Sequence, residues 1–91
     1  MKVIINVHKL SMFAKHNGKT FDAQITNRNY ITANINGVDT DLTIKEVMIV
    51  DFDNVFNTIA GVAAIVPNDR NIREMSVLKE YIAYHNIQTS N

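Results

Sequence analysis

Two aspartates that follow an apolar segment are the residues best placed to do chemistry. Asp51 directly follows the apolar residues 47–50, and Asp53 lies two positions further on. In an extended chain, side chains two residues apart point to the same side, about 6–7 Å from each other. Two such carboxylates can hold Mg²⁺ and attack phosphorus. Asp and Asn at a strand-to-helix junction also cap the helix. Capping is the role that we expect for this pair.

The segment 48–55 around the pair resembles the first motif of haloacid-dehalogenase-type phosphohydrolases. The resemblance covers these few residues only, and it implies one carboxylate as the nucleophile and the other as a Mg²⁺ ligand. Here Asn54-Val55 replaces the Gly-Thr of that family, and only 38 residues follow Asp53. A metal-dependent phosphohydrolase is therefore the least favoured function.

The remaining residues indicate no catalytic set. The chain has no Cys, no Ser-centred nucleophile motif and no Gly-rich phosphate loop. His8 and His16 on one extended strand would be roughly 26 Å apart, too far to share a zinc ion. The acidic residues between 39 and 53 lack the spacing of a calcium loop. We expect no catalytic residue, no metal, no cofactor and no enzymatic activity.

Cations with nearby aromatic rings could instead bind a partner. Aromatic stacking combined with phosphate contacts is how a sheet holds single-stranded nucleic acid. Alternatively, Lys9, Lys15, Arg70 and Arg73 could meet the phosphates of a nucleotide-like ligand at an oligomer interface. The candidate binding residues are Lys9, Phe13, Lys15, Lys19, Arg28, Tyr30, Arg70 and Arg73.

Charge is balanced overall but divided along the chain. Nine cations match nine anions. Residues 1–30 carry +4, residues 31–69 carry −5 and residues 70–91 carry +1. Neighbouring strands could neutralise these charges locally, or the charges could attract a partner of opposite sign. The zero net charge speaks against a strongly basic nucleic-acid binder, and we expect the partner to be a protein.

Length and composition exclude several classes of protein. Ninety-one residues form one domain, which we place at residues 1–87 with a loose polar tail at 88–91. The 46% of apolar residues speaks against a disordered chain, and the lack of Cys excludes a disulfide scaffold. No apolar run in the sequence is long enough to cross a membrane, and we expect that residues 1–7 are not a signal peptide, because their apolar run is too short. We expect a cytoplasmic protein with no membrane contact.

Two Asn-Gly dipeptides predict β-hairpins with type I′ turns. At Asn17-Gly18 the predicted register pairs His16 with Lys19 and places the apolar residues on one face. Those inward residues are Leu10, Met12, Ala14, Phe21, Ala23 and Ile25. One helical turn capped by Ser11 and ended by Gly18 is the alternative for residues 11–17.

The second dipeptide, Asn36-Gly37, predicts that Ile35 pairs with Val38 and Ile31 with Leu42. Residues 47–50 follow as a strand that is apolar on both faces, which predicts burial between two layers.

Residues 54–66 change to a helical period and are apolar on nearly all sides. Asp51, Asp53 or Asn54 is the expected cap, and a strand over 61–66 is the alternative. Pro67 separates this helix from a second one that Asp69 caps and that frays near His85. A helix of this composition favours burial on two sides, which a homodimer would supply. The expected interface consists of Phe56, Ile59, Val62, Ala63 and Val66.

Together these patterns predict an α+β fold, in which an antiparallel β-meander of about four strands precedes two C-terminal helices. The expected function is that of a small non-enzymatic binding or inhibitor protein, of the kind found among phage accessory proteins. It would act stoichiometrically on a host macromolecule, and we expect that macromolecule to be a protein.

Overall fold

The computed structural model describes residues 1–26 and 29–88 and confirms the α+β fold. Its antiparallel sheet precedes two C-terminal helices and has five strands where about four were expected. The strands are β1 (Lys2–Ile5), β2 (Thr20–Ile25), β3 (Ile31–Ile35), β4 (Val38–Leu42) and β5 (Val47–Val50). A short 3-10 helix (Ala14–His16) lies between β1 and β2, and the chain continues into α1 (Phe52–Ile65) and α2 (Asp69–His85).

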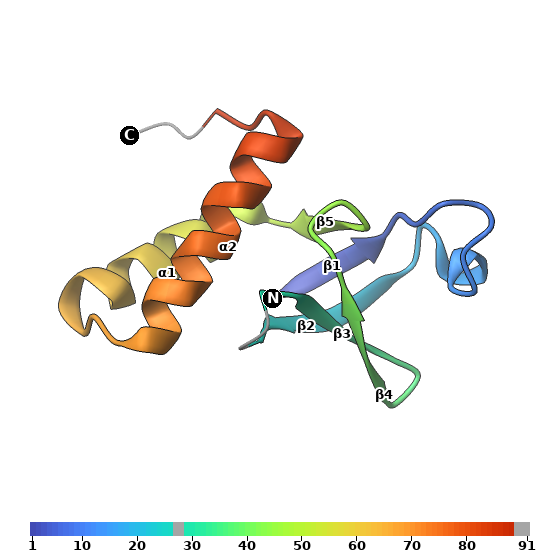
Figure 1. Cartoon of the computed structure of the whole chain (residues 1–91), viewed down its shortest axis with the longest axis horizontal. Helices are drawn as coiled ribbons and strands as arrows, with labels where there is room; N and C mark the ends of the chain where they lie inside the picture. Colours follow the sequence, from blue (N-terminus) through green and yellow to red (C-terminus); the bar gives the residue numbers. More distant parts are fainter. Residues whose placement is uncertain (27–28, 89–91) are drawn as a thin grey trace.

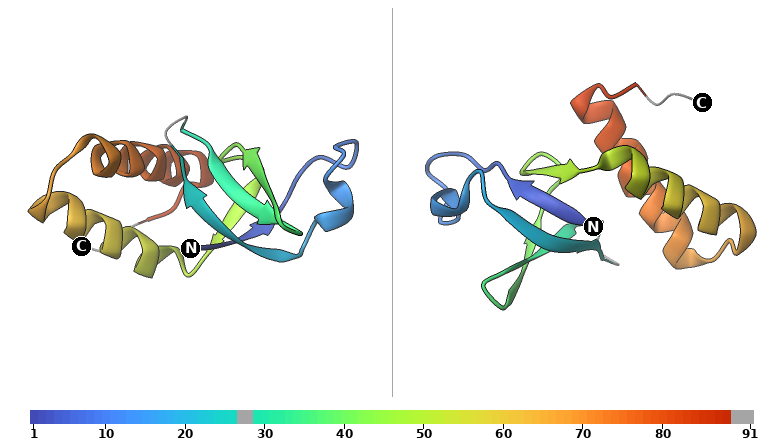
Figure 2. Two further views of the ribbon diagram at one scale, coloured as in Figure 1. Left: turned by 90° about the horizontal axis from the view of Figure 1, so that it is seen from below. Right: turned by 180° about the vertical axis from the view of Figure 1, so that it is seen from behind.

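The sheet has the strand order β4-β3-β2-β1-β5. The first four strands form the expected meander, and β5 returns to pair with β1 on the other side. Strand β2 pairs with β1 through Thr20–Asp22 and with β3 through Ala23–Ile25. Figures 1 and 2 show the β3–β4 hairpin turned away from the β1–β5 pair. Completely buried residues come from both parts, among them Val3, Ile31 and Val47.

The hairpin at Asn36-Gly37 is confirmed in its register. Ile35 pairs with Val38 and Ile31 with Leu42. Asn36 and Gly37 both have positive φ, 53° and 87°, as a type I′ turn requires. On this face Ile31, Ala33 and Ile35 of β3 are buried together with Leu42 of β4, and a shift of the register by one residue would move Leu42 out of the core.

The hairpin predicted at Asn17-Gly18 is wrong. Strand β1 ends at Ile5, and β2 pairs with it through Lys2 opposite Asp22, so residues 6–19 form a long loop. Asn17 has φ −54°, whereas a type I′ turn needs positive φ at both central residues. The helical alternative is closer, because Ala14–His16 makes one 3-10 turn before Gly18 at φ 82°.

The burial predicted on both faces of residues 47–50 is also wrong. Val47 and Ile49 are buried, but Met48 and Val50 are exposed. In β5, therefore, only one face packs against the core.

The two C-terminal helices are confirmed, but the residues that cap them differ from the prediction. Asp51 occupies the N-cap position of α1 at φ 55°, and its side chain accepts no capping hydrogen bond. Asn68, rather than Asp69, caps α2, since its side chain accepts the amide of Asn71 at 2.9 Å. The strand alternative for 61–66 is wrong, because residues 61–65 belong to α1.

Helix α2 packs against the sheet. Val77, Leu78 and Tyr81 are buried in the core, and the Tyr81 hydroxyl accepts the Ile49 amide of the edge strand β5 at 2.9 Å. The two helices lie side by side and extend beyond the sheet (Figures 1 and 2), in a molecule measuring 40 × 26 × 17 Å. Neither of the described helices has the length and apolar character needed to cross a bilayer.

Candidate protein-binding loop

Residues 6–19 form a loop that projects from the end of the sheet farthest from the helices (Figure 1). They connect β1 to β2 and contain the 3-10 turn. The loop carries Lys9, Lys15 and Lys19, three of the candidate binding residues. Its two ends are fixed by the sheet, since the Ile5 amide donates to the Lys19 carbonyl at 3.0 Å and the Gly18 amide to the Ile5 carbonyl at 2.9 Å.

Asn17 closes the loop at its base. Its Oδ1 accepts the Val7 amide at 2.8 Å, and its Nδ2 donates to the Val7 carbonyl at 3.0 Å. The side-chain amide thus satisfies both backbone groups of Val7, as a neighbouring strand would. Val7 is buried, and a buried backbone group without a partner is costly. This pair of hydrogen bonds keeps the two sides of the loop together.

Three residues attach the loop to the body of the protein. Phe13 and Ala14 pack against the hydrophobic core. His16 is only 7% exposed, and its ring meets the edge of Phe21 at a centroid distance of 5.7 Å. Within the described part of the chain its Nδ1 has no hydrogen-bond partner. The loop therefore rests on the body of the protein.

Short-range hydrogen bonds shape the tip. The Ser11 amide donates to the His8 carbonyl at 2.8 Å, and the Ala14 amide donates to the Ser11 carbonyl at 3.1 Å. Ser11 Oγ accepts the Phe13 amide at 3.2 Å, and His8 Nδ1 accepts the Leu10 amide at 3.1 Å. These bonds give the tip a defined backbone conformation.

Two large apolar side chains stand out from this tip. Leu10 is 83% exposed and Met12 is 80% exposed. Single exposed apolar residues are ordinary, but here two occur within three residues of a well-bonded loop. Around them the loop is basic, and no acidic residue precedes Asp22 in the chain. This surface consists of the apolar Leu10 and Met12 with the neighbouring Lys9 and Lys15, and we name it the basic loop tip.

The other candidate binding residues do not join this surface. Phe13 packs against the core, so it offers no free ring for stacking a base. Tyr30 directly precedes β3, and Arg28 lies outside the described residues. Arg70 and Arg73 belong to α2, at the opposite end of the molecule (Figure 1). Within one chain, the cations expected to share a nucleotide-like ligand are therefore not brought together.

Leu10 and Met12 were missed as binding residues because the sequence assigned them to the inner face of a strand. Their alternation with Ala14 fits a strand as well as it fits this loop. A sequence signal was nevertheless present, since Leu10 and Met12 lie in a segment free of acidic residues. The lack of acidic residues indicated a basic segment, but it did not indicate that Leu10 and Met12 in this segment face solvent.

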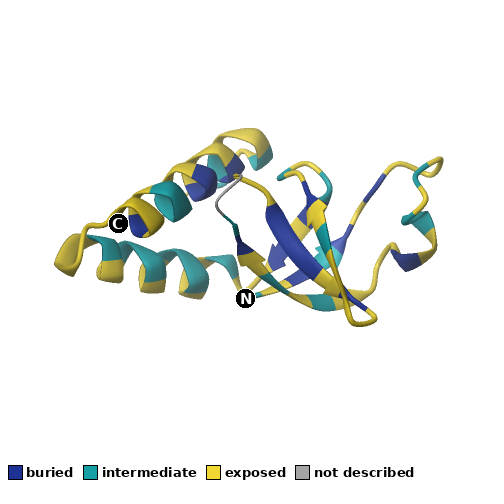
Figure 3. Ribbon diagram, turned by 60° about the horizontal axis from the view of Figure 1, so that its bottom comes forward, coloured by how far each residue is buried: buried dark blue, intermediate teal, exposed yellow. Residues whose placement is uncertain are grey.

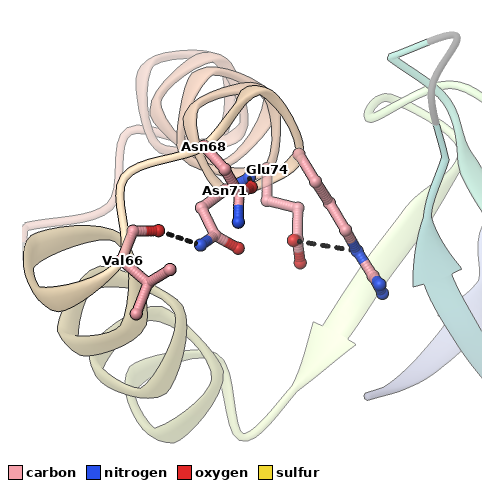
Figure 4. Close-up of polar contacts among 5 residues, drawn as sticks. Val66, Asn68, Asn71 and Glu74 are labelled. Carbon is pink, nitrogen blue, oxygen red and sulfur yellow. Dashed lines mark hydrogen bonds and ion pairs between the residues drawn. The ribbon is translucent and has the colours of Figure 1, made fainter.

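The polar residues at the start of α2 have structural partners. Arg70 Nε lies 3.4 Å from Glu74 Oε1, one helical turn further on. The Asn71 side chain donates to the Val66 carbonyl at the end of α1 (Figure 4). A hollow of about 320 Å³ lies between this region and β2, and its lining includes Ile25, Ile59 and Arg70. Of the contacts in Figure 4, the one between Asn71 and Val66 holds the turn between the helices.

The acidic pair at the start of α1 does not assemble a metal site. Asp51 and Asp53 are both exposed. Among residues 1–26 and 29–88, no three His, Cys, Asp or Glu side chains are grouped so that they could hold a metal ion.

Comparisons of the chain with protein-family models, with curated proteins and with solved structures found no match.

Proposed function

We propose that this protein is a small non-enzymatic binding protein that acts stoichiometrically on a protein partner through the basic loop tip. The observation that carries the proposal is the exposure of Leu10 and Met12 on a loop held by Asn17. A loop already in its binding conformation loses little conformational entropy when it docks. Inhibitors that block a cleft commonly use such a loop, and inhibition is the form of binding that we favour.

The chemistry of the tip defines the partner. Leu10 and Met12 require an apolar pocket, and burial of such anchors supplies most of the energy of a protein interface. Lys9, which precedes Leu10, and Lys15, which follows Met12 by three residues, require carboxylates at the rim of that pocket, which steer the encounter and select the partner. We therefore propose a folded protein whose apolar cleft has an acidic rim.

Single-stranded nucleic acid fits the tip less well. Leu and Met cannot stack on bases as aromatic rings do, and Phe13 packs against the core. Three lysines in the loop would give only a modest salt-dependent attraction to phosphates.

Site-specific photo-crosslinking tests the proposal. A photoreactive residue at position 12 is expected to cross-link one protein in an extract of the cells that make this chain. Mass spectrometry of the adduct is expected to map the cross-link to an apolar segment with nearby Asp or Glu residues. The same photoreactive residue at position 38 is the matched control, because Val38 is exposed but lies in the hairpin of β3 and β4.

Two competing results would overturn the proposal. One is an equal yield of the same adduct from positions 12 and 38. The other is tight binding of an oligothymidylate or of vesicles containing phosphatidylglycerol, together with no protein adduct from position 12.

A further inference from the structure

Helix α1 has an outer face that the rest of the described chain leaves bare. Nine of its 14 residues are apolar, yet none of the 14 is buried. The exposed residues recur every three or four positions, which places them on one side of the helix. Asp53 lies at the N-terminal end of this side, and from Asn54 onward the side carries no charge. We name that part the uncharged face, and it comprises Asn54, Asn57, Thr58, Gly61, Val62, Ala64 and Ile65. Figure 3 shows the exposed outer side along the length of α1.

Gly61 at the centre of this face is not required by the packing of the chain itself. A Cβ placed on Gly61 would meet no heavy atom within 4 Å, and the residue lies in the middle of α1. Glycine within a helix is unfavourable compared with alanine. A glycine at such a position suits the close approach of another backbone.

We propose that a second copy of this chain covers the uncharged face. The two α1 helices cross at Gly61 about a two-fold axis, and the α1–α2 pairs of both copies form a four-helix arrangement. Across such an axis every residue near the centre faces its own copy, so a charged residue there would repel itself. Residues 54–68 contain no charged side chain, which satisfies this requirement.

The polar side chains of the face also suit a symmetric contact. The Asn57 side chain makes no hydrogen bond to the described residues, and a primary amide both donates and accepts. Two such amides can therefore pair with each other across the axis, as a buried Asn does in a dimeric coiled coil. The Thr58 hydroxyl is already satisfied, because it donates to the Asn54 carbonyl at 2.8 Å.

This contact differs from the interface expected from the sequence. Phe56 and Ile59 pack against the core of their own chain, and Ala63 lines a hollow together with Ile72 and Met75 of α2. Val62 and Val66 remain exposed, although both line a hollow beside Asn71 of α2, and Asn54 lines the hollow beside β2. The proposed contact therefore centres on Gly61 and Ile65, and Ile65 is 81% exposed.

A dimer of this kind would carry its two basic loop tips far apart. The loops lie at the end of each chain opposite α1 (Figure 1), and therefore far from the two-fold axis. This separation avoids the repulsion that two cationic surfaces would have if they met at the axis. Each dimer would then offer two independent sites to the proposed protein partner. The dimer itself does not depend on that partner and is tested without it.

Sedimentation of the purified 91-residue chain at micromolar concentrations tests the inference. We expect a mass near twice 10.3 kDa and a monomer for Gly61→Leu and Ile65→Asp. Both variants are expected to keep the far-ultraviolet circular dichroism of a folded chain, because both side chains point to open solvent in the single chain. Ile72→Asp is the matched control, since Ile72 is 59% exposed but belongs to α2. This control variant is expected to remain a dimer.

Three results would overturn the inference. The wild-type chain could remain a monomer over the whole concentration range. Gly61→Leu and Ile65→Asp could both remain dimers, which would place the contact elsewhere. Ile72→Asp could dissociate as readily as Ile65→Asp, which would show a general effect of added charge.

Discussion

Asn17 takes the place of a strand beside Val7. Both backbone groups of Val7 bond to its side-chain amide, at 2.8 and 3.0 Å. The loop is therefore closed by a side chain at the point where the pairing of β1 and β2 has ended. Asn17 therefore holds together the base of the loop that presents Leu10 and Met12.

Asn17→Ala is expected to lower the free energy of unfolding by about 1–3 kcal/mol, because it leaves a buried amide and carbonyl without partners. Urea denaturation measures this loss. Asn6→Ala is the control, because the Asn6 side chain is exposed and makes no hydrogen bond to the described residues. An equal loss in both variants would contradict the closing role of Asn17.

Tyr81 joins α2 to the edge of the sheet. It is 1% exposed, and its hydroxyl accepts the Ile49 amide. Burial raises the pKa of Tyr81 above its ordinary value of about 10, and the hydrogen bond from Ile49 opposes this effect in part. The ring also stacks on Phe52 at a centroid distance of 5.2 Å.

The raised pKa of Tyr81 predicts that stability falls as the pH rises above about 10. Above that pH the unfolded chain ionises this tyrosine, whereas the folded chain keeps the proton until its higher pKa is reached. The unfolded state therefore gains a favourable ionisation that the folded state lacks. Thermal unfolding between pH 8 and about 11 is expected to show a smaller fall for Tyr81→Phe than for the wild-type chain. An identical fall in both would contradict this assignment.

The two helices begin in different ways. Asn68 caps α2 through its side chain, whereas Asp51 stands before α1 in a left-handed conformation and caps nothing. Asp53 lies in the first turn of α1 and interacts with the helix only through its charge.

Asn68→Ala is expected to cost about 0.5–2 kcal/mol, the range for a lost N-cap. Asp53→Ala is expected to cost less, about 0.3–1 kcal/mol, because only a favourable interaction with the helix dipole is lost. Chemical denaturation of both variants at one protein concentration measures the difference. A larger loss for Asp53→Ala would place the important cap on α1.

The elements differ in how far the sequence determines them. The hairpin at Asn36-Gly37 was predictable because its turn residues and the alternation of both strands agree. The dipeptide Asn17-Gly18 carries the same local signal, but there the Asn side chain bonds to Val7, ten residues away. A contact of that kind has no local pattern, so the loop, and with it the exposure of Leu10 and Met12, could not be predicted.

The two surfaces proposed for binding lie at opposite ends of the molecule. The basic loop tip lies at one end, the helical pair lies at the other, and the sheet lies between them (Figure 1). The sequence indicated the charge at the first end and the apolar character of residues 54–66. It did not indicate that Phe56 and Ile59 pack against the core while Gly61 and Ile65 face solvent, since that depends on where α2 docks.

For the whole molecule, we propose that one chain binds one partner molecule through the basic loop tip. Calorimetric titration of the partner identified by cross-linking measures this stoichiometry. We predict one partner per chain, at least tenfold weaker binding by Leu10→Ser with Met12→Ser, and unchanged binding by the exposed control Val38→Ser. Full-strength binding by the double variant would show that the partner binds elsewhere, and turnover of the partner by substoichiometric amounts of the protein would show that the protein acts as a catalyst.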